Sequence, residues 1–494
     1  MEKKRHSVPV PRLYKEASKI LKRYENREGS LKTLVYNSNY RNYGKIHGLL
    51  CKAVQNSTTI KTALALSKLF VEQPKFDPYL AQVLTTDLLL KRMPLGDCKP
   101  IAVLRKYEEK IMKVAGPNIE QQFSHNEKND CCPRYVRVNT LKTSMDRVQA
   151  QLASQGWMFL EYDPLQETYD DFLNVIQNMD ESTYLRDYHV PELLVFPPNT
   201  TFWDNILYKK NAIILQDKSS CLPVFLSSIQ SGAKVIDACA APGSKTSYIA
   251  GILNNTGHVL ATEMDSSRFE TLEKLLWQRG VTCVTTYKQN FMELPHNKFP
   301  GVEYIFVDPT CSSSGVNVYK DEVSQQRIKS LASFQVRILL YALSFPSVKE
   351  VIYSTCSVHA EENEEVVEEA LNQYHDHFKL KNLGKKLREW KHFGNTKYSC
   401  GKKCLRTNTE IDKCHGFFIA KFVRRNNKDC DKLHSDNCKG QKRKHSSCSN
   451  SQNKEELEQC MDGKNGFISE GNDASGTELI DHDNTHKRKR KSKK

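Results

Sequence analysis

The stretch "DACAAPGSKTS", from Asp237 to Ser247, follows a short apolar segment and precedes a segment with helical spacing. It predicts a tight loop between a strand and a helix, because Pro242 restricts the backbone and Gly243 lets it approach a ligand. A phosphate-binding P-loop needs adjacent Gly and Lys, whereas Ser244 separates Gly243 from Lys245. A dinucleotide-binding loop needs three glycines, and this loop has one. The ligand at this helix N-terminus is therefore expected to be of another kind.

Strand-like and helix-like stretches alternate around this loop, from about residue 212 to 424. The strand candidates are "AKVIDA", "HVLATE", "VTCVTTY", "VEYIFVD", "EVIYST" and "GFFIAKFV", with helical periodicity between several of them. This order predicts an α/β fold with a mainly parallel, doubly wound sheet. Ligands bind such sheets beyond the carboxyl ends of the strands, which is where Asp237, Glu263, Asp308 and Cys356 fall.

Three further regions flank this predicted domain. Residues 1–125 have helical spacing and are interpreted as a helical domain. Residues 126–211 are interpreted as a small α/β RNA-binding unit that begins with the strand "RYVRVNTLK" (Arg134–Lys142), whose basic residues either contact phosphate or face solvent. Residues 425–494 are polar and repetitive, end in "KRKRKSKK", and are expected to form a disordered basic tail.

The net charge of +15 points to a polyanionic partner. From Asn426 onward the chain has 15 Lys and Arg against 12 Asp and Glu, which leaves 58 basic and 46 acidic residues before it. Most of the excess charge therefore belongs to the part expected to fold, and RNA is the expected partner. The tail serves either as a localisation signal or as an RNA tether. With no long apolar run or secretory signal, we expect no membrane association and reduced cysteines.

The second strand of the predicted sheet ends at Glu263, whose carboxylate can accept hydrogen bonds from both hydroxyls of a ribose. Arg268 lies one turn into the next helix and is expected to brace it. A nucleoside ligand without a phosphate chain suits this pair better than a dinucleotide. S-adenosylmethionine is such a ligand, and we expect it as the cofactor.

Two cysteines end neighbouring predicted strands, in "VDPTCSSSG" and "IYSTCSVHAEENE". Cys311 and Cys356 would then face one cleft beside the expected methyl donor. A thiolate that adds to carbon 6 of cytosine makes carbon 5 nucleophilic enough to take a methyl group. Asp308 can favour this addition by hydrogen-bonding the exocyclic amine or N3. The chemistry alone does not decide which thiol attacks.

The motifs "DACAAPGSKT", "DPTCSSSG", "YSTCS" and "GFFIAKF" resemble, in their order and spacing, the Sun-type RNA (cytosine-5) methyltransferases. That family has a Rossmann-like S-adenosylmethionine-dependent methyltransferase domain. The resemblance covers roughly Cys131 to Val423, and "VPELLVFPP" and "ILQDKSSCLP" look most like the member that methylates large-subunit ribosomal RNA. The resemblance implies ribosomal RNA or a pre-ribosomal particle as the substrate. It also implies a location in the nucleus, and there in the nucleolus. No obligate protein partner is expected.

The resemblance also implies the roles of individual residues. Cys356 would be the nucleophile, Cys311 would assist product release, and Asp308 and Lys245 would act in catalysis. Thr310 departs from the family, in which Pro directly precedes the earlier cysteine. The cofactor would be held by Cys239, Ala240, Ala241, Pro242, Gly243, Ser244, Lys245, Glu263, Arg268 and Asp308, with Asn290 near the adenine.

Three other interpretations remain open. A non-catalytic RNA-binding ribosome-assembly factor would have a degenerate site, but both cysteines, Lys245 and Asp308 are intact. A DNA cytosine methyltransferase would have its nucleophile in the earlier motif. A zinc site at Cys400, Cys404 and Cys414 is disfavoured because no second CxxC pair completes the ligand set, and we expect no metal.

Overall fold

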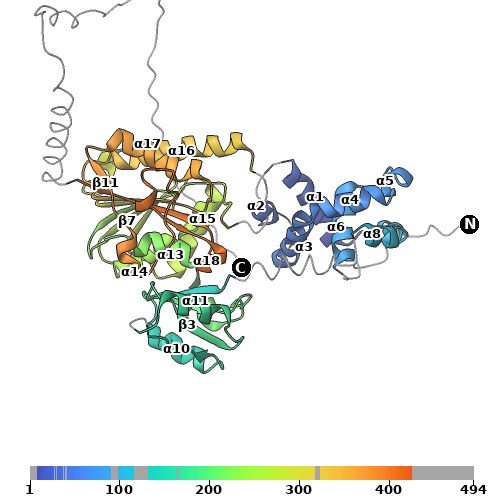
Figure 1. Ribbon diagram of the computed structural model, residues 1–494, viewed down its shortest axis with the longest axis horizontal. Coiled ribbons are helices and arrows are strands. Elements are labelled where there is room, and N and C mark those ends of the chain that lie inside the picture. Colours follow the sequence, from blue (N-terminus) through green and yellow to red (C-terminus); the bar gives the residue numbers. More distant parts are fainter. Residues whose placement is uncertain are drawn as a thin grey trace, which may run out of the picture. The chain divides into compact units, whose positions relative to one another are not determined.

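The computed structural model describes residues 8–425, apart from residues 27, 29–30, 37, 39, 41, 91–97, 116–131, 164–165 and 317–322. The predicted tail at 425–494 lies outside the described residues except for Arg425. The described part contains an N-terminal helical domain, a small α/β domain and a larger α/β domain (Figure 1).

The N-terminal domain consists of helices around an apolar core, which confirms its predicted class. In α1, buried Leu13, Ala17 and Ile20 follow helical spacing. The Tyr14 hydroxyl donates a hydrogen bond to Asp87 of α6 at 2.7 Å, which joins these two helices. The described helices of this domain are α1 (Arg12–Glu25), α2 (Leu31–Tyr36), α3 (Tyr43–Gln55), α4 (Ser57–Leu66), α5 (Leu69–Glu72), α6 (Pro78–Leu89), α7 (Lys99–Arg105) and α8 (Glu108–Ala115).

The small α/β domain has a five-stranded sheet in the order β2-β3-β4-β1-β5. Its last strand, β5, pairs with β1, so this sheet extends past the boundary that we expected at residue 211. The elements are β1 (Arg134–Val138), α10 (Met145–Ala153), β2 (Met158–Phe159), α11 (Tyr169–Gln177), β3 (Thr183–Arg186), β4 (Leu193–Phe196), α12 (Ile206–Lys209) and β5 (Ile213–Leu215).

The larger domain is built on an eight-stranded sheet with the order β11-β13-β10-β9-β6-β7-β8, and β12 pairs with β13. Strands β6 to β10 run parallel, while β13 is antiparallel to β10. The strands are β6 (Lys234–Asp237), β7 (His258–Thr262), β8 (Val284–Tyr287), β9 (Tyr304–Val307), β10 (Glu350–Thr355), β11 (Phe378–Leu380), β12 (Leu405–Thr407) and β13 (Phe417–Arg424).

Helices cover both faces of this sheet because its parallel strands are apolar on both sides. Along β6, Val235 belongs to the core shared with α13 and α14, whereas Ile236 belongs to the core shared with α16 and α17. Figure 1 shows α16 and α17 on one side of the sheet and α13 and α14 on the other. These helices, with α15, are α13 (Lys218–Phe225), α14 (Ser244–Ile252), α15 (Ser266–Gln278), α16 (Gln325–Leu343) and α17 (Glu364–Tyr374).

The strand order reverses between β6 and β9, since β7 lies on one side of β6 and β9 lies on the other. Such a reversal leaves a crevice beyond the carboxyl ends of the two strands, where ligands bind in doubly wound sheets. Asp237 ends β6, and Asp308 follows β9 directly. The fold therefore places the two predicted loops at the same edge of the sheet.

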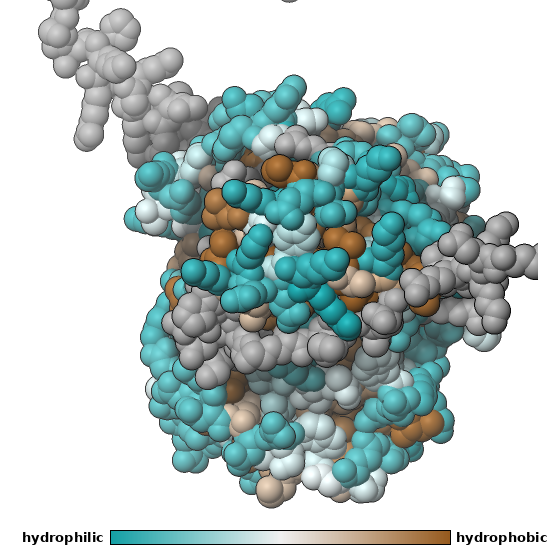
Figure 2. All heavy atoms as spheres, turned by 90° about the vertical axis from the view of Figure 1, so that its right-hand side faces the viewer, coloured by the Kyte–Doolittle hydropathy of each residue, from teal (hydrophilic) through white to brown (hydrophobic). Residues whose placement is uncertain are grey.

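The face of the molecule in Figure 2 is largely hydrophilic, with hydrophobic residues in small scattered groups. Across the residues that the structure describes, no helix combines the length and apolar character needed to cross a bilayer.

Candidate active site

The loop after β6 has the predicted form, a tight turn that leads into α14. Its Ala241–Pro242 peptide bond is cis, and Gly243 has a φ of +94°. A Cβ atom at Gly243 would lie 2.9 Å from Leu272 of α15, so both backbone and space favour glycine here. Behind the loop, the Thr246 hydroxyl donates to the buried carboxylate of Asp237 at 2.7 Å. Burial raises the pKa of Asp237 to about 6.

Glu263 and Arg268 lie together beside this loop, as predicted. The two side chains form an ion pair at 3.3 Å, and the Arg268 guanidinium also donates to the Ala241 carbonyl at 2.9 Å. The Glu263 side chain is only 4% exposed, and it accepts a hydrogen bond from the Asp265 amide at 3.0 Å. A carboxylate has about four acceptor positions, so Glu263 retains positions for a pair of ligand hydroxyls.

Lys245 reaches from α14 to the end of β9 and joins the two halves of the crevice. Its ammonium lies 2.6 Å from Asp308 and 5.1 Å from the ring centre of Phe417. Burial acts to lower the pKa of Lys245, but Asp308 more than offsets this effect, so the pKa of Lys245 is raised. The Ser354 hydroxyl donates to the other Asp308 oxygen at 2.9 Å. Both oxygens of Asp308 are thus in contact with a donor, and its side chain is 28% exposed.

The two predicted thiols meet at this edge, with their sulfur atoms 3.2 Å apart. Their hydrogen bond acts in opposite directions on the two groups. The bond from Cys311 lowers the pKa of Cys356, while the same contact, followed by burial, raises the pKa of Cys311. The Ser313 hydroxyl, 3.5 Å from the Cys356 sulfur, also lowers the pKa of Cys356. The pair therefore favours a thiolate on Cys356 and a proton on Cys311.

The remaining predicted cofactor residues lie in the loop or near it. Ala240 and Ala241 are buried against α15, and Cys239 is half-buried with a pKa that burial raises. Asn290 caps a short 3-10 helix by accepting a hydrogen bond from the Met292 amide at 3.1 Å. That contact gives Asn290 a local structural role, and its place near the adenine stays a prediction.

Arg137 is a residue whose role the sequence did not reveal. Its side chain does not face phosphate or solvent, because only 1% of the residue is exposed. The guanidinium donates to the Ser244 carbonyl at 3.3 Å and to the Ser247 hydroxyl at 3.1 Å, and it lies 4.6 Å from the Tyr248 ring centre. β1 of the small domain therefore supports the first turn of α14. The available signal was an arginine between two valines in a strand, "VRV".

The three cysteines of the zinc hypothesis are buried. Contact with Cys400, followed by burial, raises the pKa of Cys404, and burial raises the pKa of Cys414. Within the described residues no group of three or more His, Cys, Asp or Glu side chains is arranged to hold a metal ion.

Two family models match the chain, one over the larger α/β domain and one over the small α/β domain. The model described as "16S rRNA methyltransferase RsmB/F" matches residues 224–423. The model described as "NOL1/NOP2/Sun domain family member 5, ferredoxin-like domain" matches residues 132–216. A 28S rRNA (cytosine-C(5))-methyltransferase of Mus musculus is 36% identical over 83% of this chain and 91% of its own length. The chain belongs to the Sun family of rRNA (cytosine-C5) methyltransferases.

A second relative agrees with this membership, and a solved structure agrees with the fold. A 28S rRNA (cytosine-C(5))-methyltransferase of Drosophila melanogaster is 35% identical over 86% of this chain and 99% of its own length. The crystal structure of PH0851 shares the fold, with a TM-score of 0.57, 17% identity, and coverage of 84% of this chain and 100% of that one. The predicted Rossmann-like methyltransferase fold is confirmed. Thr310 is the residue that departs from the family pattern. Its carbonyl accepts a hydrogen bond from the Gln335 side chain at 3.0 Å.

Proposed function

We propose that this protein methylates carbon 5 of a cytosine in large-subunit ribosomal RNA, with S-adenosylmethionine as the methyl donor and Cys356 as a covalent nucleophile. The observation that carries the proposal is the pair of thiols 3.2 Å apart, next to the Lys245–Asp308 ion pair at the carboxyl edge of the sheet. The relatives of Mus musculus and Drosophila melanogaster carry large-subunit rRNA in their names.

The residues around the β6 loop fit S-adenosylmethionine. The buried Glu263 carboxylate has acceptor positions left for ribose hydroxyls, and Arg268 fixes its orientation. When bound, S-adenosylmethionine supplies an electrophilic methyl group on a sulfonium centre. The loop Cys239–Ser244 would approach this ligand through its backbone. The positive end of α14 and the Asp308 carboxylate would also face it.

The first covalent step belongs to Cys356. Its thiolate adds to carbon 6 of the cytosine and forms a sulfur–carbon bond, and the electron pair of the 5,6 double bond moves toward carbon 5. Carbon 5 could then take the methyl group that bound S-adenosylmethionine would supply, and the electron pair of the old sulfur–methyl bond would stay on the donor sulfur. Asp308 would hold the exocyclic amine of the base during these steps, because its carboxylate still has acceptor positions.

The second step returns Cys356 to its starting state. The proton on carbon 5 passes to water, its electron pair re-forms the 5,6 double bond, and the bond between carbon 6 and Cys356 breaks. The departing thiolate then receives the hydrogen bond that Cys311 donates across 3.2 Å. Cys311 thus assists release by stabilising the leaving group.

RNA binding is assigned to the folded part of the chain. Residues before Asn426 carry 58 basic against 46 acidic residues, which suits a polyanionic partner. The small domain is proposed as the RNA-binding unit, and the nucleolus as the place of action, since large-subunit RNA is the proposed target. The alternative, an assembly factor that binds RNA without turnover, has no feature of the site in its favour.

Substitution of each thiol tests the proposal. Each variant is expressed with its RNA and run on a denaturing gel, and bisulfite sequencing maps methylation in cells with and without the protein. We expect Cys356→Ala to lose methylation and to form no adduct, because no thiolate attacks carbon 6. We expect Cys311→Ala to accumulate protein crosslinked to RNA.

An adduct from Cys356→Ala with none from Cys311→Ala would reverse the two roles. Retained methylation in both variants would exclude the covalent mechanism. RNA binding without methylation by the unmodified protein would favour the assembly factor.

A further inference from the structure

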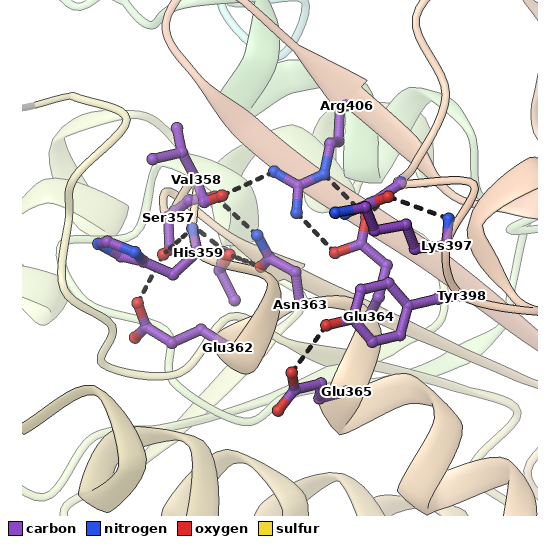
Figure 3. A network of polar contacts seen from close by, with 12 residues as sticks. Ser357, Val358, His359, Glu362, Asn363, Glu364, Glu365, Lys397, Tyr398 and Arg406 are labelled. Atoms are coloured by element: carbon purple, nitrogen blue, oxygen red, sulfur yellow. Dashed lines mark hydrogen bonds and ion pairs between the residues drawn. The ribbon is translucent and has the colours of Figure 1, made fainter. Parts of the chain in front are cut away.

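The segment after Cys356 contains three consecutive polar residues that are fully buried, Glu362, Asn363 and Glu364. They lie where the 3-10 helix η3 (Ala360–Glu362) meets α17, and Figure 3 shows them from close by. Carboxylates are rarely buried to this degree unless hydrogen bonds replace their lost hydration. The proposed reaction gives these three residues no role.

Glu362 links the two loops that carry the thiols. One carboxylate oxygen accepts hydrogen bonds from the Ser312 amide at 2.9 Å and from the Gln335 side chain at 3.0 Å. The other oxygen accepts a hydrogen bond from the Ser357 hydroxyl at 2.5 Å. Ser312 directly follows Cys311, and Ser357 directly follows Cys356. One buried carboxylate therefore fixes a residue next to each sulfur.

Asn363 holds the loop on both sides of Cys356. Its amide oxygen accepts a hydrogen bond from the Thr355 hydroxyl at 2.5 Å, and its amide nitrogen donates to the Ser357 carbonyl at 2.9 Å. Thr355 and Ser357 are the two neighbours of Cys356, so the backbone of the nucleophile is fixed before and after it. Figure 3 shows Asn363 and Glu362 both directed toward this turn.

The two cysteine loops also bind each other directly. The Ser312 hydroxyl donates to Ser357 at 3.1 Å, and the Gly315 amide donates to the carbonyl of Cys356 at 3.0 Å. The serines of "CSSSG" thus face the turn of the second cysteine, and Glu362 lies at the end of this network.

Glu364 is equally buried but serves a different part of the fold. It accepts two hydrogen bonds from Arg406, at 2.8 and 2.6 Å, and one from the Asn395 amide at 2.7 Å. Its own bonds run to β12 and the segment before it, and none runs to a residue next to either thiol. Glu362 and Glu364 therefore form a matched pair of buried carboxylates with different partners.

We propose that Glu362 and Asn363 are positioning residues that hold the sulfur atoms of Cys311 and Cys356 within hydrogen-bond distance for attack and release. The proposal rests on the covalent function above. A shift of about 1 Å in a reacting group can cost on the order of a hundredfold in rate, and the contact between the sulfurs depends on two separate loops. The carboxylate of Glu362 accepts hydrogen bonds from both loops.

The test compares Glu362→Ala, Glu362→Gln and Glu364→Ala in the full chain. Iodoacetamide alkylation of Cys356 is followed by peptide mass spectrometry as a function of pH, alongside kcat, the KM for S-adenosylmethionine and thermal unfolding. We expect Glu362→Ala to move the alkylation profile to higher pH and to lower kcat by about ten- to a hundredfold, with KM unchanged. Glu362→Gln should recover most of both, since an amide oxygen still accepts from Ser312 and the Ser357 hydroxyl can accept from the amide nitrogen.

Glu364→Ala is the structural control, and it should lower the unfolding temperature but leave the alkylation profile of the folded protein in place. If Glu362→Ala does not fold, Ser357→Ala removes one of the three contacts of the Glu362 carboxylate, together with the bonds of the Ser357 hydroxyl to Ser312 and Ser314, and the same alkylation profile is measured. A wild-type profile in Glu362→Ala, or an equal shift in Glu364→Ala, would overturn the proposal. Since alkylation needs no RNA, a failure of methylation by the unmodified protein would count against the proposed function alone.

Discussion

Two lysine–aspartate pairs of almost equal length differ in what surrounds them. Lys218 and Asp187 are 2.7 Å apart with both side chains 0% exposed, whereas Lys245 and Asp308 are 2.6 Å apart with side chains 10% and 28% exposed. Both pairs join different segments of the fold. Neither the charges nor the distance separates them, so the difference has to come from their environment.

Aromatic rings enclose the first pair. The Lys218 ammonium lies 4.9 Å from the ring centre of Tyr169, 5.4 Å from that of Phe172 and 5.8 Å from that of Trp390. Asp187 uses its other oxygen to accept from the amides of His189 and Val190. This pair joins the small domain to the larger one, and neither side chain is accessible to solvent.

The second pair lies beside the thiols and keeps free acceptor positions. Asp308 is bound by Lys245 and Ser354 and is still partly exposed, and Cys356 lies close enough for the Lys245 charge to lower its pKa. Partial exposure next to a thiol with a shifted pKa, more than the presence of an ion pair, therefore distinguishes the proposed catalytic pair from the enclosed one.

Removal of the enclosed lysine should have the largest effect on stability. Lys218→Ala leaves the Asp187 carboxylate buried without its cation, and breaking such a pair costs about 3–5 kcal/mol. Chemical denaturation should show this loss in the free energy of unfolding. The double variant Lys218→Met with Asp187→Asn should recover much of it, because no buried charge is left unpaired and the amide oxygen still accepts from the His189 and Val190 amides. If the single variant lost under about 1 kcal/mol, the two pairs would not differ as argued.

Removal of Lys245 should affect the reaction instead. Lys245→Met takes a fixed positive charge from the crevice, and the loss of one such electrostatic group typically lowers kcat by about 10²–10³-fold. The free energy of unfolding should fall by less than it does in Lys218→Ala. Methylation of an RNA fragment measures the first quantity and denaturation the second. A large loss of stability with normal kcat per folded molecule would place Lys245 with the structural pair.

The sequence was sufficient to place Lys245 and Asp308 at one edge of the sheet, but it did not show that Lys218 and Asp187 meet. Asp308, Glu263, Cys311 and Cys356 lie in loops after parallel strands, and Lys245 lies in the first turn of a helix. The carboxyl ends of neighbouring parallel strands meet at one edge of a doubly wound sheet, which brings such residues together. Asp187 directly follows β3 and Lys218 begins α13, but these elements belong to different domains, and no local pattern shows that the two side chains meet. Their pairing follows from how two domains pack.

The same limit explains the other differences from the prediction. Arg137 lies in a strand pattern that favoured contact with phosphate or solvent, but packing of β1 on α14 buries it. Glu362 was visible only as one glutamate in "HAEENEE". Two of its partners, Ser312 and Gln335, lie 50 and 27 positions earlier in the chain. Long-range pairings of this kind have no signature in a single sequence.

Substitution of Glu263 should have a smaller effect. Like Asp308, Glu263 is a carboxylate that a neighbouring cation orients and that still has free acceptor positions. Glu263→Ala should weaken binding of S-adenosylmethionine by about 1–3 kcal/mol, the cost of an unsatisfied buried partner. Calorimetric titration measures it, with the exposed Glu270→Ala in the same region as the control. Unchanged affinity would remove Glu263 from the ribose site.

The smallest effect that we expect concerns the pH at which Cys356 reacts. The hydrogen bond from Cys311 is the main cause of the lowered pKa of Cys356, and the charge of Lys245 adds a weaker contribution of the same sign. A lowered pKa means that the thiolate, which is the form that iodoacetamide alkylates, persists to lower pH than in an ordinary thiol. Lys245→Met should therefore move the alkylation profile of Cys356 to higher pH, by less than Cys311→Ala does.

The variant Lys218→Met is the matched control for Lys245→Met. Lys218 is not among the main causes of the lowered pKa of Cys356, so its loss should leave the alkylation profile of the folded protein nearly unchanged. Alkylation at several pH values, read on the Cys356 peptide below the unfolding temperature of each variant, separates the two lysines without RNA or cofactor. An equal shift in both variants would mean that the profile reports loosening of the fold, and the distinction between an open and an enclosed ion pair would fail at this site.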